Sequence, residues 1–145
     1  MNILFVCTGN TCRSPMAAAI LASREIPGMK VKSAGVFAMP GSEASLSAQE
    51  VLKEQGLTPE HTSTQVTEEL LEWSDFVFTM TNQHKMLLEN SYPACIGKTF
   101  TLKGFIEQQG EVSDPYGGPV SMYRQTFEEL QEAIGLVIER LKDKT

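Results

Sequence analysis

A potential nucleophile and a potential anion-binding side chain lie close together near the start of the sequence. The thiol of Cys7 and the guanidinium of Arg13 are separated by five residues in the string CTGNTCRS, residues 7–14. A loop of this length that leads into a helix can curl so that its backbone N–H groups point inward and bind an anion. An arginine adds a planar, two-pronged donor that matches phosphate oxygens. The spacing therefore predicts a phosphate-binding cradle formed by Thr8, Gly9, Asn10, Thr11, Cys12 and Arg13.

The place of Cys7 beneath this cradle makes it the expected nucleophile. Amides and a helix terminus that favour phosphate also stabilise a thiolate, and Ser14 can donate a hydrogen bond to that sulfur. An isolated C-x5-R string is usually a buried cysteine followed by a surface arginine. Here the apolar run before it, the Gly9-Asn10 pair inside it and the Ser-Pro helix start after it favour the cradle. The nucleotide-binding strings GxxxxGK[ST] and GxGxxG do not occur.

Strands and helices alternate along the chain. Residues 3–7 are typical of a buried strand, and Ser14 and Pro15 are the expected N-cap and first residue of a helix. Further strands are expected at 29–35, 75–80 and 98–102, and helices at 46–55, 68–73 with Thr67 as cap, 82–89 and 120–142. This order predicts an α/β fold: a single-domain, four-stranded, mostly parallel sheet with helices on both faces and the phosphate-binding loop after the first strand. Ligands of such sheets bind at the carboxyl ends of the strands, where Cys7 lies.

Length and composition exclude several other classes of protein. A chain of 145 residues suits one domain, which we expect to span residues 1–145. The net charge of -6 argues against nucleic acid and anionic membranes as partners. We find no signal peptide and no run of transmembrane length, and three cysteines, an odd number, are typical of free thiols. We expect a cytoplasmic protein, with a monomer as the default.

The string CTGNTCRSP resembles the C-x5-R-S signature of the low-molecular-weight protein tyrosine phosphatases. The resemblance extends to SAG at 33–35, to His61 before QVT at 65–67 and to DPYGG at 114–118, so it spans essentially the whole chain. Within that family the sequence is most similar to the bacterial protein arginine phosphatases, in which the fifth loop position is threonine, as Thr11 is here.

The resemblance implies roles for residues outside the loop. Asp114 matches the family's general acid, which protonates the leaving group and then deprotonates the water that hydrolyses the phosphocysteine. Taken alone, Asp114-Pro115 is an ordinary turn start. Tyr116 matches the aromatic wall of the substrate cleft, although it is equally typical of an aromatic that flanks a turn. The resemblance further implies that a hydrogen-bond network supports the loop through Asn10, Ser14, Ser33 and His61.

Two loop residues bear on specificity and on redox behaviour. Phosphoarginine carries a polar guanidinium beside the phosphorus, whereas phosphotyrosine carries an apolar ring, for which isoleucine is the typical family residue at the position of Thr11. We therefore expect phosphoarginine as substrate, with phosphotyrosine as the alternative. Cys12 is close enough to Cys7 in sequence to trap an oxidised nucleophile as a disulfide. The alternative is that Cys12 and Thr11 are small loop residues without either role.

The sequence predicts a cytoplasmic phosphatase that acts on phosphorylated proteins through a phosphocysteine, with no metal and no other cofactor. Arsenate reductases with the same loop need a resolving pair of cysteines late in the chain, and here the only later cysteine is Cys95. A non-catalytic phosphoprotein-binding module could dispense with Cys7 and Asp114. His84, which matches no catalytic position, is expected at the surface.

Overall fold

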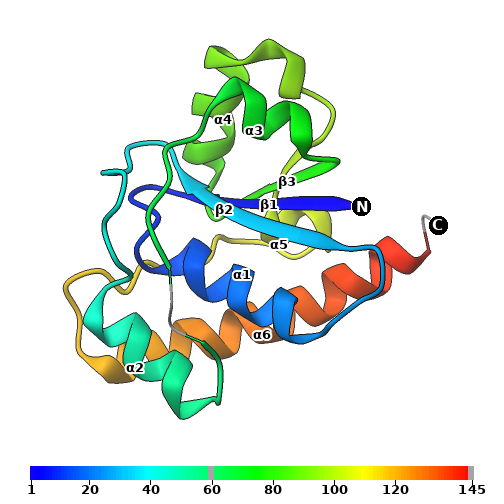
Figure 1. Ribbon diagram of the computed structural model, residues 1–145. Helices are drawn as coiled ribbons and strands as arrows, with labels where there is room; N and C mark the ends of the chain where they lie inside the picture. Colours follow the sequence, from blue (N-terminus) through cyan, green and yellow to red (C-terminus); the bar gives the residue numbers. More distant parts are fainter. Residues whose placement is uncertain (59–60, 144–145) are drawn as a thin grey trace.

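The computed structural model describes residues 1–58 and 61–143 (Figure 1). The strands in this part of the chain are β1 (Asn2–Cys7), β2 (Lys30–Gly35), β3 (Phe76–Thr79) and β4 (Thr99–Thr101). They form one parallel sheet in the order β2-β1-β3-β4. The helices are α1 (Arg13–Ser23), α2 (Leu46–Glu54), α3 (Glu68–Trp73), α4 (Asn82–Ser91), the 3-10 turn η1 (Pro93–Cys95), α5 (Leu102–Phe105) and α6 (Val120–Lys142).

Strand β1 lies in the interior of the sheet, and its sequence explains why. Parallel strands pair with both of its edges, and apolar side chains from the helices cover both of its faces, so a continuous apolar run is favoured. Alternate side chains point to opposite faces: Ile3 and Phe5 join one apolar cluster, and Leu4 and Val6 join another. The strand is therefore held firmly up to its last residue, Cys7.

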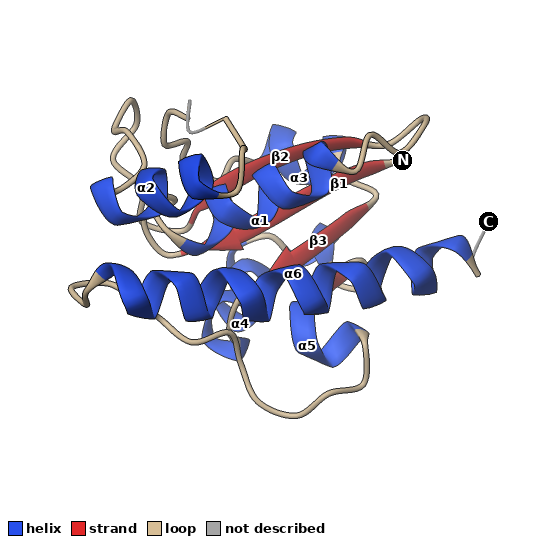
Figure 2. Ribbon diagram, turned by 90° about the horizontal axis from the view of Figure 1, so that it is seen from below, coloured by secondary structure: helices blue, strands red, loops and turns tan. Residues whose placement is uncertain are grey.

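Helices cover both faces of the sheet. Helices α3 and α4 lie on one face, and α1 and α6 lie on the other with α2 beside them (Figure 1). Seen from below, α1 and α6 lie on the near side of the sheet (Figure 2). The core stripe of α6 consists of Tyr123, Phe127, Leu130, Ile134, Val137 and Leu141, all buried. Among the described residues no helix is both long enough and apolar enough to span a membrane.

The structure confirms the predicted α/β fold and several of its details. Helix α6 has the predicted bounds, Val120–Lys142, and the Thr67 side chain caps α3 by accepting a hydrogen bond from the Leu70 amide. All paired strands are parallel. The loop that follows β1 leads directly into α1, as the sequence predicted.

Some predicted element ends are wrong. Helix α1 begins at Arg13 with Cys12 as its N-cap, because the Ser14 hydroxyl contacts Cys7 and Asn10 and does not cap the helix. Strand β4 ends at Thr101, whose side chain caps the short helix α5, an element that the sequence did not predict. The turn η1 was also not predicted.

Candidate active site

The loop between β1 and α1 turns sharply at Asn10. This residue has a positive φ of 56°, a conformation that asparagine tolerates better than most residues, and its side chain is fully buried. Its Nδ2 donates to Ser14 Oγ at 2.7 Å and to Ser33 Oγ at 3.0 Å, and its Oδ1 accepts from the Thr64 amide at 2.9 Å. One side chain thus ties the loop to α1, to β2 and to the segment after residue 60.

The Asn10 carbonyl is held by a second set of donors. His61 Nε2 lies 2.7 Å from this oxygen and Ser63 Oγ donates to it at 2.9 Å. Because a carbonyl only accepts, the proton of the His61 ring is on Nε2. Burial lowers the pKa of His61, and the bond to Asn10 partly offsets this. The structure thus brings His61 to the loop as the sequence predicted, and it adds Ser63 and Thr64, which the sequence analysis missed.

Gly35 allows the loop to pack against β2. A Cβ at this position would lie 2.4 Å from the Thr8 carbonyl oxygen and 2.9 Å from the Asn10 nitrogen, distances that exclude any larger residue without backbone movement. Gly35 is also the register partner of Cys7. The end of β2 therefore has to be glycine for the loop to curl beside it.

The Cys7 sulfur lies at the carboxyl end of β1, 2.9 Å from Ser14 Oγ. Since Ser14 Oγ already accepts from Asn10, its own proton is available to the sulfur, and the alternative acceptor, the Ala34 carbonyl oxygen, is more distant at 3.5 Å. Both Cys7 and Ser14 are buried. This contact is the one expected for a hydroxyl that stabilises a thiolate.

Arg13 is buried and is fixed by the segment that precedes α6. Its Nη1 donates to the Val112 carbonyl at 3.1 Å, and its Nη2 lies 3.6 Å from Asp114 Oδ2. Val112 is itself attached to the sheet, because its amide donates to the Met80 carbonyl after β3 at 3.1 Å. The Asp114 side chain stays 57% exposed. The segment before α6 therefore brings a carboxylate to the mouth of the loop.

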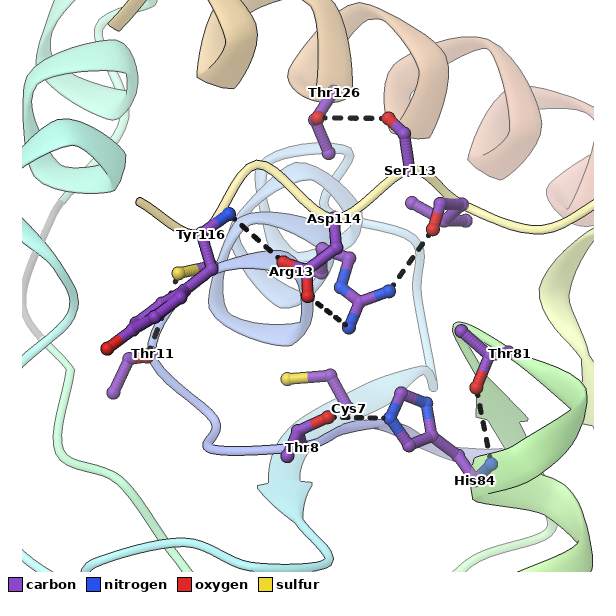
Figure 3. Close-up of polar contacts among 12 residues, drawn as sticks. Cys7, Thr8, Thr11, Arg13, Thr81, His84, Ser113, Asp114, Tyr116 and Thr126 are labelled. Carbon is purple, nitrogen blue, oxygen red and sulfur yellow. Dashed lines mark hydrogen bonds and ion pairs between the residues drawn. The ribbon is translucent and has the colours of Figure 1, made fainter. Parts of the chain in front are cut away.

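These groups surround one pocket of about 230 Å³ (Figure 3). Its lining consists of Cys7, Thr8, Gly9, Thr11, Cys12, Arg13, Asp114 and Tyr116. Tyr116 is 78% exposed, and its backbone amide donates to Asp114 Oδ1 at 3.0 Å, which ties the carboxylate to the backbone of residue 116. The nucleophile, arginine, carboxylate and aromatic residue that the sequence singled out thus lie around the same space. Their catalytic roles remain predictions.

Comparison with known proteins identifies the family. The family model described as low molecular weight phosphotyrosine protein phosphatase matches residues 2–145. The chain belongs to this family.

Its relatives carry two kinds of name. A protein-arginine-phosphatase of Geobacillus stearothermophilus is 50% identical over 142 residues, which are 97% of this chain and 96% of the relative. A low molecular weight protein-tyrosine-phosphatase PtpB of Staphylococcus aureus is 41% identical over 143 residues, 99% of this chain and 98% of the relative. A solved structure described as a YwlE arginine phosphatase C7S mutant with a phosphorylated active site serine is 44% identical. It has a TM-score of 0.94 and covers 98% of this chain and 96% of that chain.

His84 is not a surface residue, so that prediction is wrong. It lies in the first turn of α4, is only 5% exposed, and its Nε2 is 2.9 Å from Thr8 Oγ1 (Figure 3). The signal that could have found it is its position, because the start of a helix after a parallel strand lies at the carboxyl edge of the sheet. Without a partner assigned to it, the residue looked like any polar residue at a helix start.

The ionisation of His84 predicts a pH dependence of stability. Burial, together with the nearby Arg13, lowers its pKa from 6.5 to about 4, although Glu111 and Asp114 act in the other direction. Between these two values the unfolded chain binds a proton on this ring and the folded chain does not. The free energy of unfolding should therefore fall as pH drops from about 6.5 to about 4, by roughly 1–3 kcal/mol from this group. Urea unfolding at pH 7 and pH 5 should reveal a larger loss for the wild type than for His84→Gln. An equal loss in both proteins would contradict the prediction.

The three cysteines are free thiols in this structure. Cys12 is buried beside Tyr123, with 3.4 Å between its sulfur and the Tyr123 hydroxyl oxygen, and burial together with this contact raises the pKa of Tyr123 to about 12. Cys95 packs with the apolar cluster on the other face of the sheet from Cys7. The disulfide between Cys7 and Cys12 stays a prediction. In the arsenate reductases, the related enzymes considered above, a late cysteine pair reduces the first cysteine, and the place of Cys95 does not suit that task.

Proposed function

We propose that this protein is a phosphatase that hydrolyses phosphoarginine on proteins through a phosphocysteine intermediate at Cys7. The observation that carries the proposal is the pocket itself, in which a buried thiol with a hydroxyl partner, a buried guanidinium and an exposed carboxylate surround one space. The names of two relatives, 50% and 44% identical to the chain, support phosphoarginine as the substrate.

In the first step the Cys7 thiolate attacks phosphorus from the floor of the pocket. The backbone N–H groups of the loop and the two-pronged Arg13 guanidinium hold the non-bridging phosphate oxygens. As the S–P bond forms and the P–N bond breaks, the acid form of Asp114 gives its proton to the leaving nitrogen. Asp114 suits this role because it stands at the mouth of the pocket, 3.6 Å from Arg13, and is open to solvent.

In the second step water hydrolyses the phosphocysteine. The Asp114 carboxylate takes a proton from the water as the new P–O bond forms, and the S–P bond breaks to release inorganic phosphate. The electron pair returns to the Cys7 sulfur, where the Ser14 hydroxyl stabilises the thiolate. The enzyme is then ready for another cycle, and no cofactor takes part in either step.

The partner that we propose is a phosphorylated protein, as the names of the relatives suggest, and the exposed Tyr116 at the pocket leaves room for a side chain of another protein to enter. The thiol, guanidinium and carboxylate that the two steps need all lie within one chain, and we propose that a monomer formed by the single domain of residues 1–145 is active. A reactive thiol with two other free cysteines suits the reducing cytoplasm, which is the location that we propose.

Thr11 is the residue that we propose separates phosphoarginine from phosphotyrosine, the second candidate substrate. It lines the pocket beside Tyr116, and its Oγ1 lies 3.7 Å from Cys12 Sγ, a weak contact that leaves the hydroxyl available to a polar substrate. The relatives named protein-tyrosine-phosphatase, at 41% identity, favour the second candidate. Both candidates use the same two chemical steps.

Replacing Thr11 with isoleucine should shift the preference toward phosphotyrosine. The aliphatic side chain packs against an aryl ring and leaves guanidinium donors unpaired, so the ratio of kcat/KM for phosphoarginine to that for phosphotyrosine should fall by about 10–100-fold. The measurement is turnover of both substrates by the wild type, Thr11→Ile and the shape-matched control Thr11→Val. A wild type that hydrolyses phosphotyrosine but not phosphoarginine would refute the proposed substrate, and an unchanged ratio in Thr11→Ile would remove Thr11 as its determinant.

A further inference from the structure

The side chain of Thr8 has no task in the cradle, which uses backbone N–H groups. Thr8 is exposed and lines the pocket, and its hydroxyl oxygen lies 2.9 Å from Nε2 of the buried His84 (Figure 3). The two residues are 76 positions apart in the chain. A hydroxyl at the pocket mouth is therefore held from behind by a ring that substrate does not reach.

His84 is well placed to fix this hydroxyl. It stands in the first turn of α4, where its amide donates to the capping hydroxyl of Thr81 at 3.3 Å, so the backbone that carries the ring is itself anchored. Among the described residues, its Nδ1 is the only buried side-chain nitrogen or oxygen without a hydrogen-bond partner. The contact with Thr8 is thus the only polar contact that the structure gives the ring. Near neutral pH the ring is uncharged, because burial and Arg13 lower its pKa.

The Thr8 oxygen can accept another hydrogen bond in either tautomer of His84. If Nε2 carries the proton, Thr8 Oγ1 accepts it and keeps one lone pair. If Nε2 is unprotonated, Thr8 donates to it and keeps two lone pairs. In both cases an acceptor remains on an exposed side chain that lines the pocket.

We propose that Thr8 is a second specificity-determining residue, whose hydroxyl oxygen accepts an N–H of the substrate guanidinium, and that His84 is the positioning residue that orients it. The inference rests on the proposed function and deepens it. A phosphorylated guanidine keeps N–H donors next to the phosphorus, whereas an aryl phosphate has none there. An oriented acceptor at this place stabilises only the first of these substrates.

The test is a matched pair of variants, Thr8→Val and Thr8→Ser, assayed on phosphoarginine and on p-nitrophenyl phosphate. Valine keeps the shape of threonine and lacks the hydroxyl, while serine keeps the hydroxyl. The ratio of kcat/KM for phosphoarginine to that for the aryl phosphate should fall by about tenfold in Thr8→Val and should stay within about threefold of the wild type in Thr8→Ser. An unchanged ratio in Thr8→Val, or an equal fall in both variants, would overturn the proposal.

His84→Phe then tests whether His84 acts by orienting the Thr8 hydroxyl or only by supporting the loop. The ratio should fall in this variant, and adding it to Thr8→Val should lower the ratio no further, because both changes remove the same contact. Effects on the ratio that multiply in the double variant would overturn the role of His84. If thermal unfolding shows that His84→Phe does not fold, His84→Gln takes its place, because glutamine retains a hydrogen-bonding side chain. His84→Gln should keep the wild-type ratio of kcat/KM values. A fall of the ratio in His84→Gln would overturn the role of His84. A wild type inactive on phosphoarginine refutes the proposed function, whereas an active wild type with an insensitive Thr8→Val refutes only this inference.

Discussion

Replacing Cys7 with serine should lower kcat for phosphoarginine by about ten-thousand-fold or more. A serine hydroxyl does not ionise in the loop near neutral pH, so the attacking anion is lost. The serine oxygen takes the place of the sulfur, so the fold should be retained. The Ser14 hydroxyl, 2.9 Å from the sulfur, stabilises a thiolate and cannot generate an alkoxide. The variant should still bind phosphate or vanadate, since the loop amides and Arg13 remain.

Cys12→Ser is the matched control, because it makes the same chemical change in the same loop. Cys12 Sγ makes weak hydrogen bonds with the hydroxyls of Tyr123 at 3.4 Å and Ser45 at 3.7 Å. The sulfur of Cys12 takes part in neither step of the proposed mechanism. Its effect on kcat should therefore be much smaller than that of Cys7→Ser. The preparations are first shown to be free of contaminating phosphatase. If Cys7→Ser is then as active as the wild type, another group must attack phosphorus.

Replacing Asp114 with asparagine should lower kcat for phosphoarginine by about 100–10,000-fold. The size of the loss should depend on the leaving group. A guanidine leaves only with a proton, whereas p-nitrophenolate leaves readily as an anion, so the first step should suffer far less with p-nitrophenyl phosphate. Steady-state and single-turnover rates with both substrates measure this difference.

Asp143→Asn makes the same change of charge at the C-cap of α6, the end of the helix opposite to the segment that carries Asp114, and Asp143 does not line the pocket. It should leave both rates near those of the wild type. A loss in Asp114→Asn that is equally large for both leaving groups in the first step would point to a role of Asp114 in holding Arg13 rather than in proton transfer, because the two side chains lie 3.6 Å apart.

The parts of the site that could be predicted are those that local sequence determines. The apolar run of β1 is followed at once by the cradle and the start of α1, so Cys7 and Arg13 are positioned within one strand-loop-helix unit. Asp114 was predicted only through the resemblance to a family, because an Asp-Pro pair by itself predicts a turn. Its place depends on the contacts of Val112 with Met80 and with Arg13, which join distant segments.

The residues that sequence analysis missed are polar side chains that tertiary contacts bury. His84 reaches Thr8 across 76 positions, and Ser63 and Thr64 reach Asn10 across more than 50. No periodicity marks such residues, since their burial depends on which loops meet at the edge of the sheet. Ser14 was misassigned for a related reason: as an N-cap it would satisfy a local rule, but the hydrogen bonds to Asn10 and Cys7 take its hydroxyl.

The most direct test is to trap the enzyme during turnover and locate the phosphate. Wild-type enzyme is mixed with phosphoarginine, and Asp114→Asn, which should hydrolyse the intermediate more slowly, is mixed with p-nitrophenyl phosphate, whose leaving group needs no proton. Both are quenched within milliseconds at alkaline pH and digested for mass spectrometry. The account predicts a phosphoryl group on the peptide that contains Cys7, assigned to its sulfur by fragmentation and absent from Cys7→Ala. A phosphoryl group on another residue, or turnover with no phosphorylated enzyme in either protein, would contradict it.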